Sequence, residues 1–302
     1  MPDDIISEIA ELKAQRNAVI LAHNYTLPEV QDLADFTGDS LELSLKARDV
    51  NAPCIVFCGV SFMAETAKIL APRSTVLNPD PCAGCRMADM ADAAAVRNYK
   101  EQHPDTVLVA YVNTTAAVKA EVDICCTSAN ADRVVASIPK DKKILFLPDR
   151  NLGSNITGSL GREMEFWPGC CPIHDGITAE HIAAARKLHP GATVLVHPEC
   201  RPAVVAAADK ALSTGGMLRF VKNSEDREFV VGTEYGIIHR LEKENPGKRF
   251  YSLDPRPCCS DMKLVTAEKI RDALRDGKPE VVLPAELMDR ARRAIERMLE
   301  IR

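Results

Sequence analysis

The sequence predicts an α/β fold of three similar three-layer αβα domains, with parallel sheets in a pseudo-three-fold arrangement around a central active site. One observation is the alternation of buried, β-rich runs with helical stretches, which is typical of parallel sheets covered by helices. A second is that this pattern recurs at offsets of about 87 residues, as in repeat architectures. Units of this size are small, so they gain stability by packing together.

Each predicted unit opens with an apolar, β-rich strand. The strands are equivalent across the repeat, because a valine near the start of each is spaced by 88 and then 87 residues. They cover residues 18–25, 106–113 and 193–200, aligned on Val19, Val107 and Val194.

A helical stretch that ends on a polar turn follows each strand. Aspartates and hydroxyl residues recur at matching places in the three stretches. We expect the aspartates to be structural and to bond the turn, whereas the hydroxyls could cap helices, contact a ligand, or do both. The stretches cover 28–40, 116–128 and 202–214 and contain Asp35, Asp123 and Asp209, then Ser40, Ser128 and Thr214.

A second strand and a weaker third strand complete each unit, and the third leads to a cysteine-bearing turn. Composition alone could align the strands, but it would not also align the cysteines and hydroxyls. The second strands cover 54–60, 143–149 and 228–234, and the turns cover 79–85, 167–171 and 255–259. The aligned cysteines are Cys85, Cys171 and Cys259, spaced by 86 and 88 residues.

The C-terminal tail resembles the beginning of a fourth unit. It reads as a helix at 265–276, a strand at 280–284 and a last helix at 285–300. We expect this tail to complete the first unit. The predicted domains are residues 1–87 completed by 265–302, then 88–176, then 177–264.

Composition narrows the class of protein. The 302 residues include 46% hydrophobic ones, enough for a substantial core. The net charge of −5 is not gathered in blocks, and a nucleic-acid binder would need a basic face. No apolar run approaches the ~20 residues of a membrane span, and residues 1–13 are acidic and amphipathic, unlike a targeting signal. We therefore expect a cytoplasmic protein with neither a nucleic-acid nor a membrane partner.

The chain holds 11 cysteines, and six of them lie in adjacent pairs. Adjacent cysteines cross-link nothing, and a cytosolic compartment reduces thiols, so we expect no disulfide scaffold. Thiols that are more than small buried hydrophobes indicate metal or redox chemistry.

Polar side chains stand at the carboxyl end of the first strand of each unit, where parallel α/β units bind ligands. If the three units face one another, these side chains converge on one central cavity. They are His23, Asn24 and Tyr25 in the first unit, Tyr111 and Asn113 in the second, and His197 and Glu199 in the third. Glu199 could act as a general base if burial raises its pKa towards neutrality.

Three aligned cysteines could share one metal centre, but spacing leaves two interpretations open. A structural zinc usually takes four ligands from C-x2–4-C pairs, and only Cys82 and Cys85 have that spacing. A 4Fe–4S cluster on three cysteines would keep one iron without a protein ligand, available as a Lewis acid for dehydration. Alternatively, the cysteines are buried thiols that duplication has preserved.

Motifs spread over nearly the whole chain resemble those of the quinolinate synthase family. They are AHNY (22–25), PEVQDLADFTGDSLEL (28–43), FMAETAKIL (62–70), AGCRMADM (83–90), YVNT (111–114), CTSAN (126–130), HPEC (197–200), GTEYGIIHRL (232–241) and CCSDMK (258–263). Several of these motifs are long enough to be specific.

The resemblance implies three similar α/β domains around an active site that holds a 4Fe–4S cluster by three cysteines. It implies condensation of iminosuccinate with dihydroxyacetone phosphate to quinolinate, with loss of phosphate and two waters, for NAD biosynthesis. By this resemblance the AGC motif assigns Cys85, a W-x-G-x-C-x-x-H pattern at 167–174 assigns Cys171, and a C-x-x-M pattern at 259–262 assigns Cys259 as ligands. The repeat alignment selects the same three cysteines. The implied partner is an aspartate oxidase or dehydrogenase that produces iminosuccinate.

The resemblance also assigns the substrate site. The implied substrate contacts are His23, Ser40, Tyr111, Asn113, Ser128, His174, His197, Glu199 and Thr214, and the catalytic candidates are Tyr25, His23, Tyr111, His197 and Glu199. Lys46, Lys119 and Arg133 are expected on solvated helix faces. Two other functions stay open: an iron–sulfur hydro-lyase acting on another small hydroxy acid, and a zinc- or thiol-stabilised binding protein for small anions.

Overall fold

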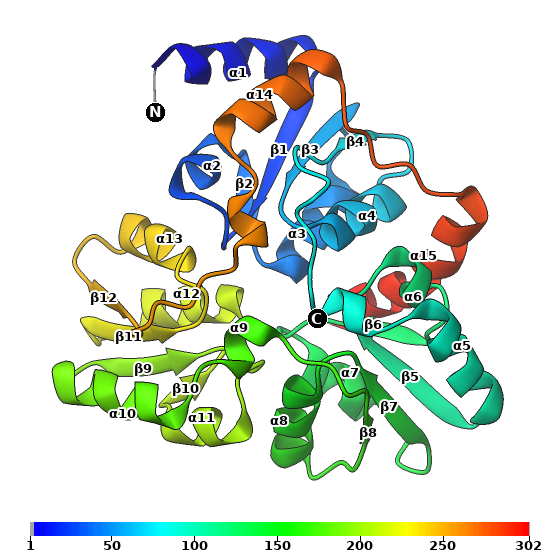
Figure 1. The fold of residues 1–302 in the computed structure, drawn as a ribbon, viewed down its shortest axis with the longest axis vertical. Coiled ribbons are helices and arrows are strands. Elements are labelled where there is room, and N and C mark those ends of the chain that lie inside the picture. The colour runs from blue at the N-terminus through cyan, green and yellow to red at the C-terminus, as the bar shows by residue number, and fades with distance from the viewer. Residues whose placement is uncertain (1–2, 302) are drawn as a thin grey trace.

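The strands of residues 3–301, which the computed structural model describes, form three four-stranded parallel sheets. The strand order is the same in each sheet: β2-β1-β3-β4, β6-β5-β7-β8 and β10-β9-β11-β12. The sheets and their helices are arranged around a common centre (Figure 1). The structure therefore confirms the predicted fold class, whereas the exact domain boundaries stay a prediction. None of the described helices is long and apolar enough to cross a bilayer.

The first unit shows why these segments become strands and helices. Strand β3 of this unit is buried along its whole length, as expected of a parallel sheet covered on both faces. Helix α3 begins at a capping box made by Asp39 and Glu42. The elements are α1 (Asp3–Gln15), β1 (Ala18–His23), α2 (Pro28–Leu33), β2 (Phe36–Gly38), α3 (Ser40–Asp49), β3 (Cys54–Cys58), α4 (Ser61–Leu70), β4 (Thr75–Leu77) and the 3-10 turn η1 (Ala88–Met90).

The second and third units repeat this order. The second contains α5 (Ala93–Gln102), β5 (Thr106–Tyr111), α6 (Ala116–Lys119), β6 (Ile124–Cys126), α7 (Ala131–Ser137), β7 (Lys143–Leu147), α8 (Arg150–Leu160) and β8 (Glu165–Phe166). The third contains α9 (Pro172–Asp175), α10 (Ala179–Leu188), β9 (Thr193–Val196), α11 (Pro202–Ala207), β10 (Lys210–Ala211), α12 (Thr214–Asn223), β11 (Glu228–Gly232), α13 (Ile237–Glu244) and β12 (Arg249–Ser252).

The three predicted helical stretches are wrong in one respect. Each divides into a short helix and a short edge strand, which are α2 and β2, α6 and β6, and α11 and β10. The repeated aspartates explain the edge strands. In every unit the aspartate donates its backbone N–H to the first strand, and its carboxylate accepts an N–H from the same residue of that strand. The bonded pairs are Asp35 with Ile20, Asp123 with Leu108, and Asp209 with Val194. The aspartates are structural, as expected, but they bond the strand rather than the turn.

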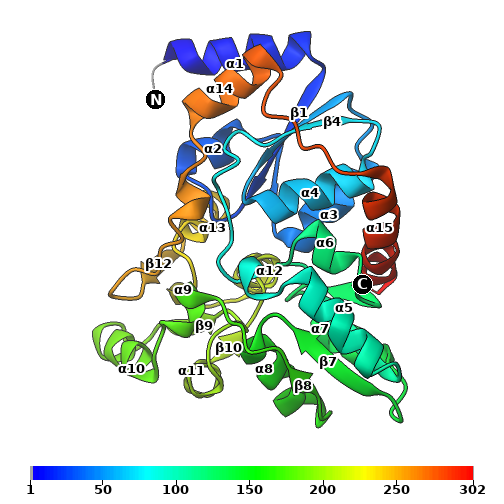
Figure 2. The ribbon, with the colours of Figure 1, turned by 45° about the vertical axis from the view of Figure 1, so that its right-hand side comes forward.

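The C-terminal tail divides between two units. Helix α14 (Ala267–Asp276) packs against α1, and α15 (Ala285–Glu300) packs against α6 and β6 of the second unit and α4 of the first. Figures 1 and 2 show α14 beside α1 from two directions. The prediction of a strand at 280–284 is wrong, because these residues make only an isolated bridge to β4. Proline at both 279 and 284 removes N–H donors that a longer ladder would need.

The first and third units meet closely at Gly215. Its backbone N–H donates to the Asp39 carboxylate. A Cβ atom on Gly215 would lie 2.6 Å from Oδ2 of Asp39 and 3.0 Å from Oε1 of Glu42. These carboxylates are held by reciprocal bonds of 2.9 Å, so they cannot move away without losing the cap of α3.

We expect Gly215→Ala to lower the free energy of unfolding by about 1–3 kcal/mol, the usual cost of overpacking a tight site. Chemical denaturation monitored by circular dichroism would measure the change. Gly191→Ala is the matched control, because a Cβ atom there meets nothing within 4 Å. A change at Gly215 no larger than that at Gly191 would show that the two units do not depend on this close contact.

Candidate active site

A cavity of about 300 Å³ is lined by side chains from all three units. The polar ones lie at the carboxyl ends of strands or in the loops that follow them, as parallel topology requires. The structure brings every predicted site residue to this cavity: His23, Tyr25, Ser40, Cys85, Tyr111, Asn113, Ser128, Cys171, His174, His197, Glu199, Thr214 and Cys259. Their separate roles stay predictions.

Each unit contributes one of the aligned cysteines to the cavity wall, and all three are half-buried. A backbone hydrogen bond repeated in every unit holds each cysteine loop. In this bond, the backbone N–H of the third residue after strand β3, β7 or β11 donates to the carbonyl of the residue two positions before the cysteine. The bonds are Ser61 to Ala83 (2.7 Å), Arg150 to Gly169 (2.9 Å) and Tyr235 to Pro257 (3.0 Å).

The chemistry of the three thiols suits a shared metal group. Burial raises the pKa of Cys85 to about 12 and raises the pKa values of Cys171 and Cys259 above their ordinary value. Cys85 also lies close enough to the other two for their charges to interact. A bound cation would reverse these shifts, because metals stabilise thiolates. The exposed Cys258 also lines the cavity, but the Tyr235 hydroxyl bonds its thiol.

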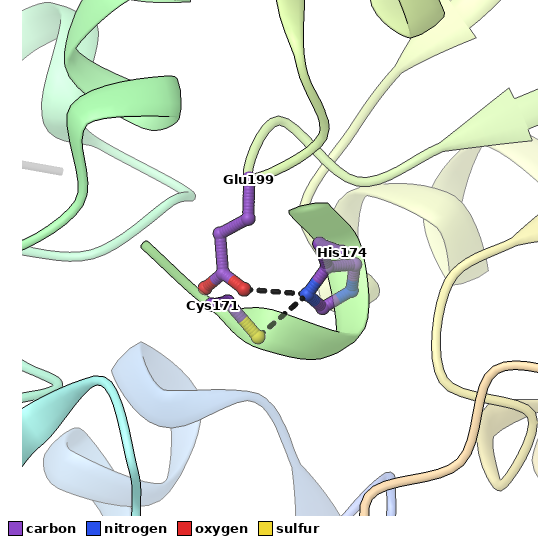
Figure 3. A group of neighbouring side chains, drawn as sticks. All are labelled: Cys171, His174 and Glu199. Atoms are coloured by element: carbon purple, nitrogen blue, oxygen red, sulfur yellow. Dashed lines mark hydrogen bonds and ion pairs between the residues drawn. The ribbon is translucent and has the colours of Figure 1, made fainter. Parts of the chain in front are cut away.

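A second set of possible metal ligands consists of Cys171, His174 and Glu199, whose ligand atoms lie within 4.8 Å of one another (Figure 3). The Nδ1 atom of His174 is 2.6 Å from Oε2 of Glu199 and 3.2 Å from Sγ of Cys171. Ligand atoms of a tetrahedral zinc stand about 3.3 Å apart, given its usual bond lengths. The short distance between His174 and Glu199 therefore favours a hydrogen bond over a shared ion.

A buried hydrogen-bonded chain joins the two cavity tyrosines. The Tyr25 hydroxyl lies 2.5 Å from the Thr233 hydroxyl, which lies 2.7 Å from Nε2 of His174. His174 then bonds Glu199 through Nδ1, and the Tyr111 hydroxyl donates to Oε1 of Glu199 at 2.5 Å. The chain thus links cavity side chains of the first and second units through groups that are shielded from bulk water.

The electrostatics of this chain differ from our expectation for Glu199. Burial alone would raise its pKa, but the adjacent His174 side chain and the hydrogen bonds from His174 and Tyr111 lower the pKa below its ordinary value. Glu199 is therefore ionised at neutral pH. Burial and this negative charge raise the pKa values of Tyr25 and Tyr111, so both phenols keep their protons.

His23 and His197 occupy equivalent positions and make the same local bond. The backbone N–H two residues later donates to Nδ1, from Tyr25 at 3.2 Å and from Glu199 at 3.3 Å. Burial lowers the pKa of both imidazoles to about 3. Each ring is therefore neutral at physiological pH and carries its proton on Nε2. In His197 this atom lies 3.2 Å from the Ser128 hydroxyl.

The three repeated hydroxyls do not cap helices, so the capping alternative is wrong. Asp39 and Ser213 cap α3 and α12, one residue before Ser40 and Thr214. Ser128 precedes Asn130, the residue before α7. The hydroxyls instead face the cavity, where Thr214 accepts a bond of 3.0 Å from the side chain of Asn24.

Lys119 does not lie on a solvated face as expected. It is fully buried, its ammonium donates to the carbonyl of Thr114, and it stands 5.2 Å from the ring of Phe62. Burial lowers its pKa to about 8. The charge is accommodated by a carbonyl and an aromatic face rather than by water.

Sequence reasoning missed two residues of the site, Thr233 and Glu234. Both are buried and follow β11 directly, and Glu234 lines the cavity. The signal was present, since both belong to the motif at 232–241. The end of the second strand of the third unit, β11, faces the same cavity as the end of its first strand, β9.

The comparisons with known proteins cover nearly the whole chain. A family model described as Quinolinate synthetase A protein matches residues 7–300. The chain is 54% identical over 299 residues to a protein from Desulforudis audaxviator named quinolinate synthase, with 99% of each chain covered. Proteins with the same name from Methanoregula boonei and Thermus thermophilus are 52% and 50% identical, with 97–98% of each chain covered.

Proposed function

Because the chain belongs to the quinolinate synthetase A family, we propose that it condenses iminosuccinate with dihydroxyacetone phosphate to form quinolinate for NAD biosynthesis. Phosphate and two waters leave in this reaction, which balances all atoms. The observation that carries the proposal is the convergence of one aligned cysteine and a set of polar side chains from each unit on one cavity. The unpaired cysteines suit a reducing cytoplasm.

We assign Cys85, Cys171 and Cys259 as the ligands of a 4Fe–4S cluster. When bound, the cluster would supply a Lewis acid, because three protein ligands leave one iron available to substrate oxygen. The donor set supports this assignment, since thiolates are the usual ligands of such clusters. A zinc- or thiol-stabilised binding protein would not need ionisable groups joined across the cavity.

The cavity wall suits acidic substrates. His23 and His197 present neutral N–H donors, and the repeated hydroxyls add further donors. Neutral donors bind carboxylates and phosphate without first needing a proton. The Asn113 Oδ1 atom is buried and has no hydrogen-bond partner among the described residues, so it can accept from a substrate N–H or O–H group. These contacts would hold two substrates in one orientation, which converts an encounter into a positioned reaction.

Proton transfer would use the chain between the two tyrosines. Ionised Glu199 accepts from Nδ1 of His174, which leaves Nε2 able to accept a proton from Thr233, while Thr233 takes one from Tyr25 and Tyr25 takes one from the substrate. The Tyr111 hydroxyl donates to the other oxygen of Glu199, so a proton held by the His174–Glu199 pair would return to the cavity along the same path, through Thr233 and Tyr25. General acid–base assistance of this kind contributes roughly 10²–10⁴-fold to a rate.

The direct test is an anaerobic assay of the purified protein after reconstitution with iron and sulfide. Iminosuccinate would be generated from aspartate in the same vessel by an aspartate oxidase or dehydrogenase, the class of enzyme that must supply it. We expect quinolinate and phosphate in equal amounts, and no quinolinate when dihydroxyacetone phosphate is omitted. A brown, iron-loaded protein that forms no quinolinate would instead support a hydro-lyase, and a colourless, zinc-loaded protein would support an anion-binding function.

A further inference from the structure

The internal repeat gives each unit an equivalent position two residues after strand β3, β7 or β11. It immediately precedes the residue that bonds the cysteine loop. Strands β3, β7 and β11 end at Cys58, Leu147 and Gly232, so the positions are Val60, Asp149 and Glu234. The residue that follows each of them makes the backbone bond to the cysteine loop described above. Asp149 and Glu234 are therefore structural equivalents, whereas Val60 offers no acceptor in the first unit.

Both carboxylates bind the backbone of the cysteine in their own unit. Asp149 is fully buried, and its Oδ2 atom accepts from the N–H of Cys171 at 3.3 Å. Glu234 is 1% exposed, and its Oε1 atom accepts from the N–H of Cys259 at 3.2 Å. Two loops that lie far apart in the sequence are thus held by the same bond, from the cysteine N–H to a buried carboxylate. Duplication of the chain does not by itself require this bond to be kept.

Each carboxylate also has a second set of bonds that holds it in place. Oδ1 of Asp149 accepts from the N–H groups of Asn151 and Leu152, at 2.8 and 3.0 Å, and so caps α8. Oε2 of Glu234 accepts from the N–H of Gly236 at 2.7 Å. The carboxylates are therefore rigid supports.

Lys263 connects the Glu234 support to the first unit. Its ammonium lies 3.0 Å from Oε1 of Glu234 and donates to the carbonyl of Tyr25 at 2.5 Å. The loop of Cys259 and the backbone of Tyr25, at the start of the proton chain, are therefore held by one ion pair between half-buried Lys263 and buried Glu234. A displaced Glu234 would disturb both.

We propose that Asp149 and Glu234 are positioning residues for the metal centre, which they serve by holding the backbones of Cys171 and Cys259, whereas Cys85 is held without a carboxylate. The proposal rests on the proposed function, because it takes these cysteines as cluster ligands. Groups that orient metal ligands typically change metal affinity by 10–100-fold when they are replaced.

Asp149→Asn and Glu234→Gln test this idea with side chains of unchanged volume. An amide has one acceptor oxygen, so it cannot accept at both of its ends. In Asp149→Asn the oxygen will keep the two cap bonds of α8, and the NH₂ group will then oppose the N–H of Cys171. In Asp149→Asn the fold should persist while the contact to Cys171 is lost, and Glu234→Gln removes the charge that pairs with Lys263 beside Cys259.

We expect each variant, reconstituted anaerobically, to release iron to a chelator about 10–100-fold faster than the parent protein. The electron paramagnetic resonance signal of the reduced cluster should also change shape, which a purely structural role would not cause. Asp123→Asn is the matched control, because Asp123 makes the same kind of bond to a backbone N–H, that of Leu108, in the sheet of the second unit. It should lower thermal stability and leave iron release and the resonance signal unchanged.

The outcomes are separable. Iron release at the parental rate with an unchanged signal in Asp149→Asn and Glu234→Gln would overturn the proposal. So would equal acceleration in Asp123→Asn, since the effect would then follow general destabilisation. A parent protein that binds no iron would instead overturn the proposed function itself.

Discussion

Cys171→Ser is expected to abolish both stable cluster binding and quinolinate formation. Cys171 is the contribution of the second unit to a cavity that also holds Cys85 and Cys259. With a weaker oxygen ligand in its place, two thiolates would remain for a group that needs three. Anaerobic iron and sulfide analysis should fall from about four irons per chain to a small fraction of that value. Quinolinate formation should fall below detection in the same samples.

Cys170→Ser provides the matched control for this prediction. Cys170 is the immediate neighbour of Cys171, but its side chain is not among those that line the cavity in the described part of the chain. We expect Cys170→Ser to retain iron and activity. If Cys170→Ser lost its iron while Cys171→Ser kept it, the assignment of the ligand within this pair would be wrong.

Glu199→Gln is expected to lower kcat by about 10²–10⁴-fold while leaving the iron content unchanged. The carboxylate accepts from Tyr111 at one oxygen and bonds His174 at the other. Glutamine can accept at only one end, so the proton chain is interrupted, and the negative charge that holds the Nδ1 proton of His174 is lost. Quinolinate formation normalised to cluster content would measure this effect.

Glu121→Gln is the control for the loss of a buried carboxylate. Glu121 is 7% exposed and pairs with Arg97 and Arg290, and it is not among the residues that line the cavity in the described chain. We expect its kcat to match that of the parent protein. A Glu199→Gln variant with parental kcat would exclude the proton chain from the rate-limiting chemistry.

Periodic sequence features predicted the fold because each of them reflects a local requirement. The apolar, β-rich runs around Val19, Val107 and Val194 are typical of buried strands, and their spacing indicated three units. The aligned cysteines predicted one candidate metal ligand from each unit, and the structure places all three in the wall of one cavity. Residues at the carboxyl ends of β1, β5 and β9 could be named because parallel topology sends those ends to one side of a sheet.

Short elements were less predictable. Strands β2, β6 and β10 have only 3, 3 and 2 residues, too few for a periodic pattern. Their pairing depends on an aspartate that bonds the neighbouring strand, which becomes visible only when both segments are placed. The run at 280–284 has the composition of a strand, but flanking prolines and an exposed Val282 leave it outside the sheets.

Patterns within each unit are enough to predict the repeated architecture and the residues that converge on the cavity. The protonation states and burial of those residues depend instead on how the three units pack. Glu199 is ionised although it is buried, His23 and His197 are neutral, and Lys119 lies in the interior. The physical reason is that desolvation and hydrogen bonding at each group depend on side chains from other units. No segment read alone can supply those neighbours.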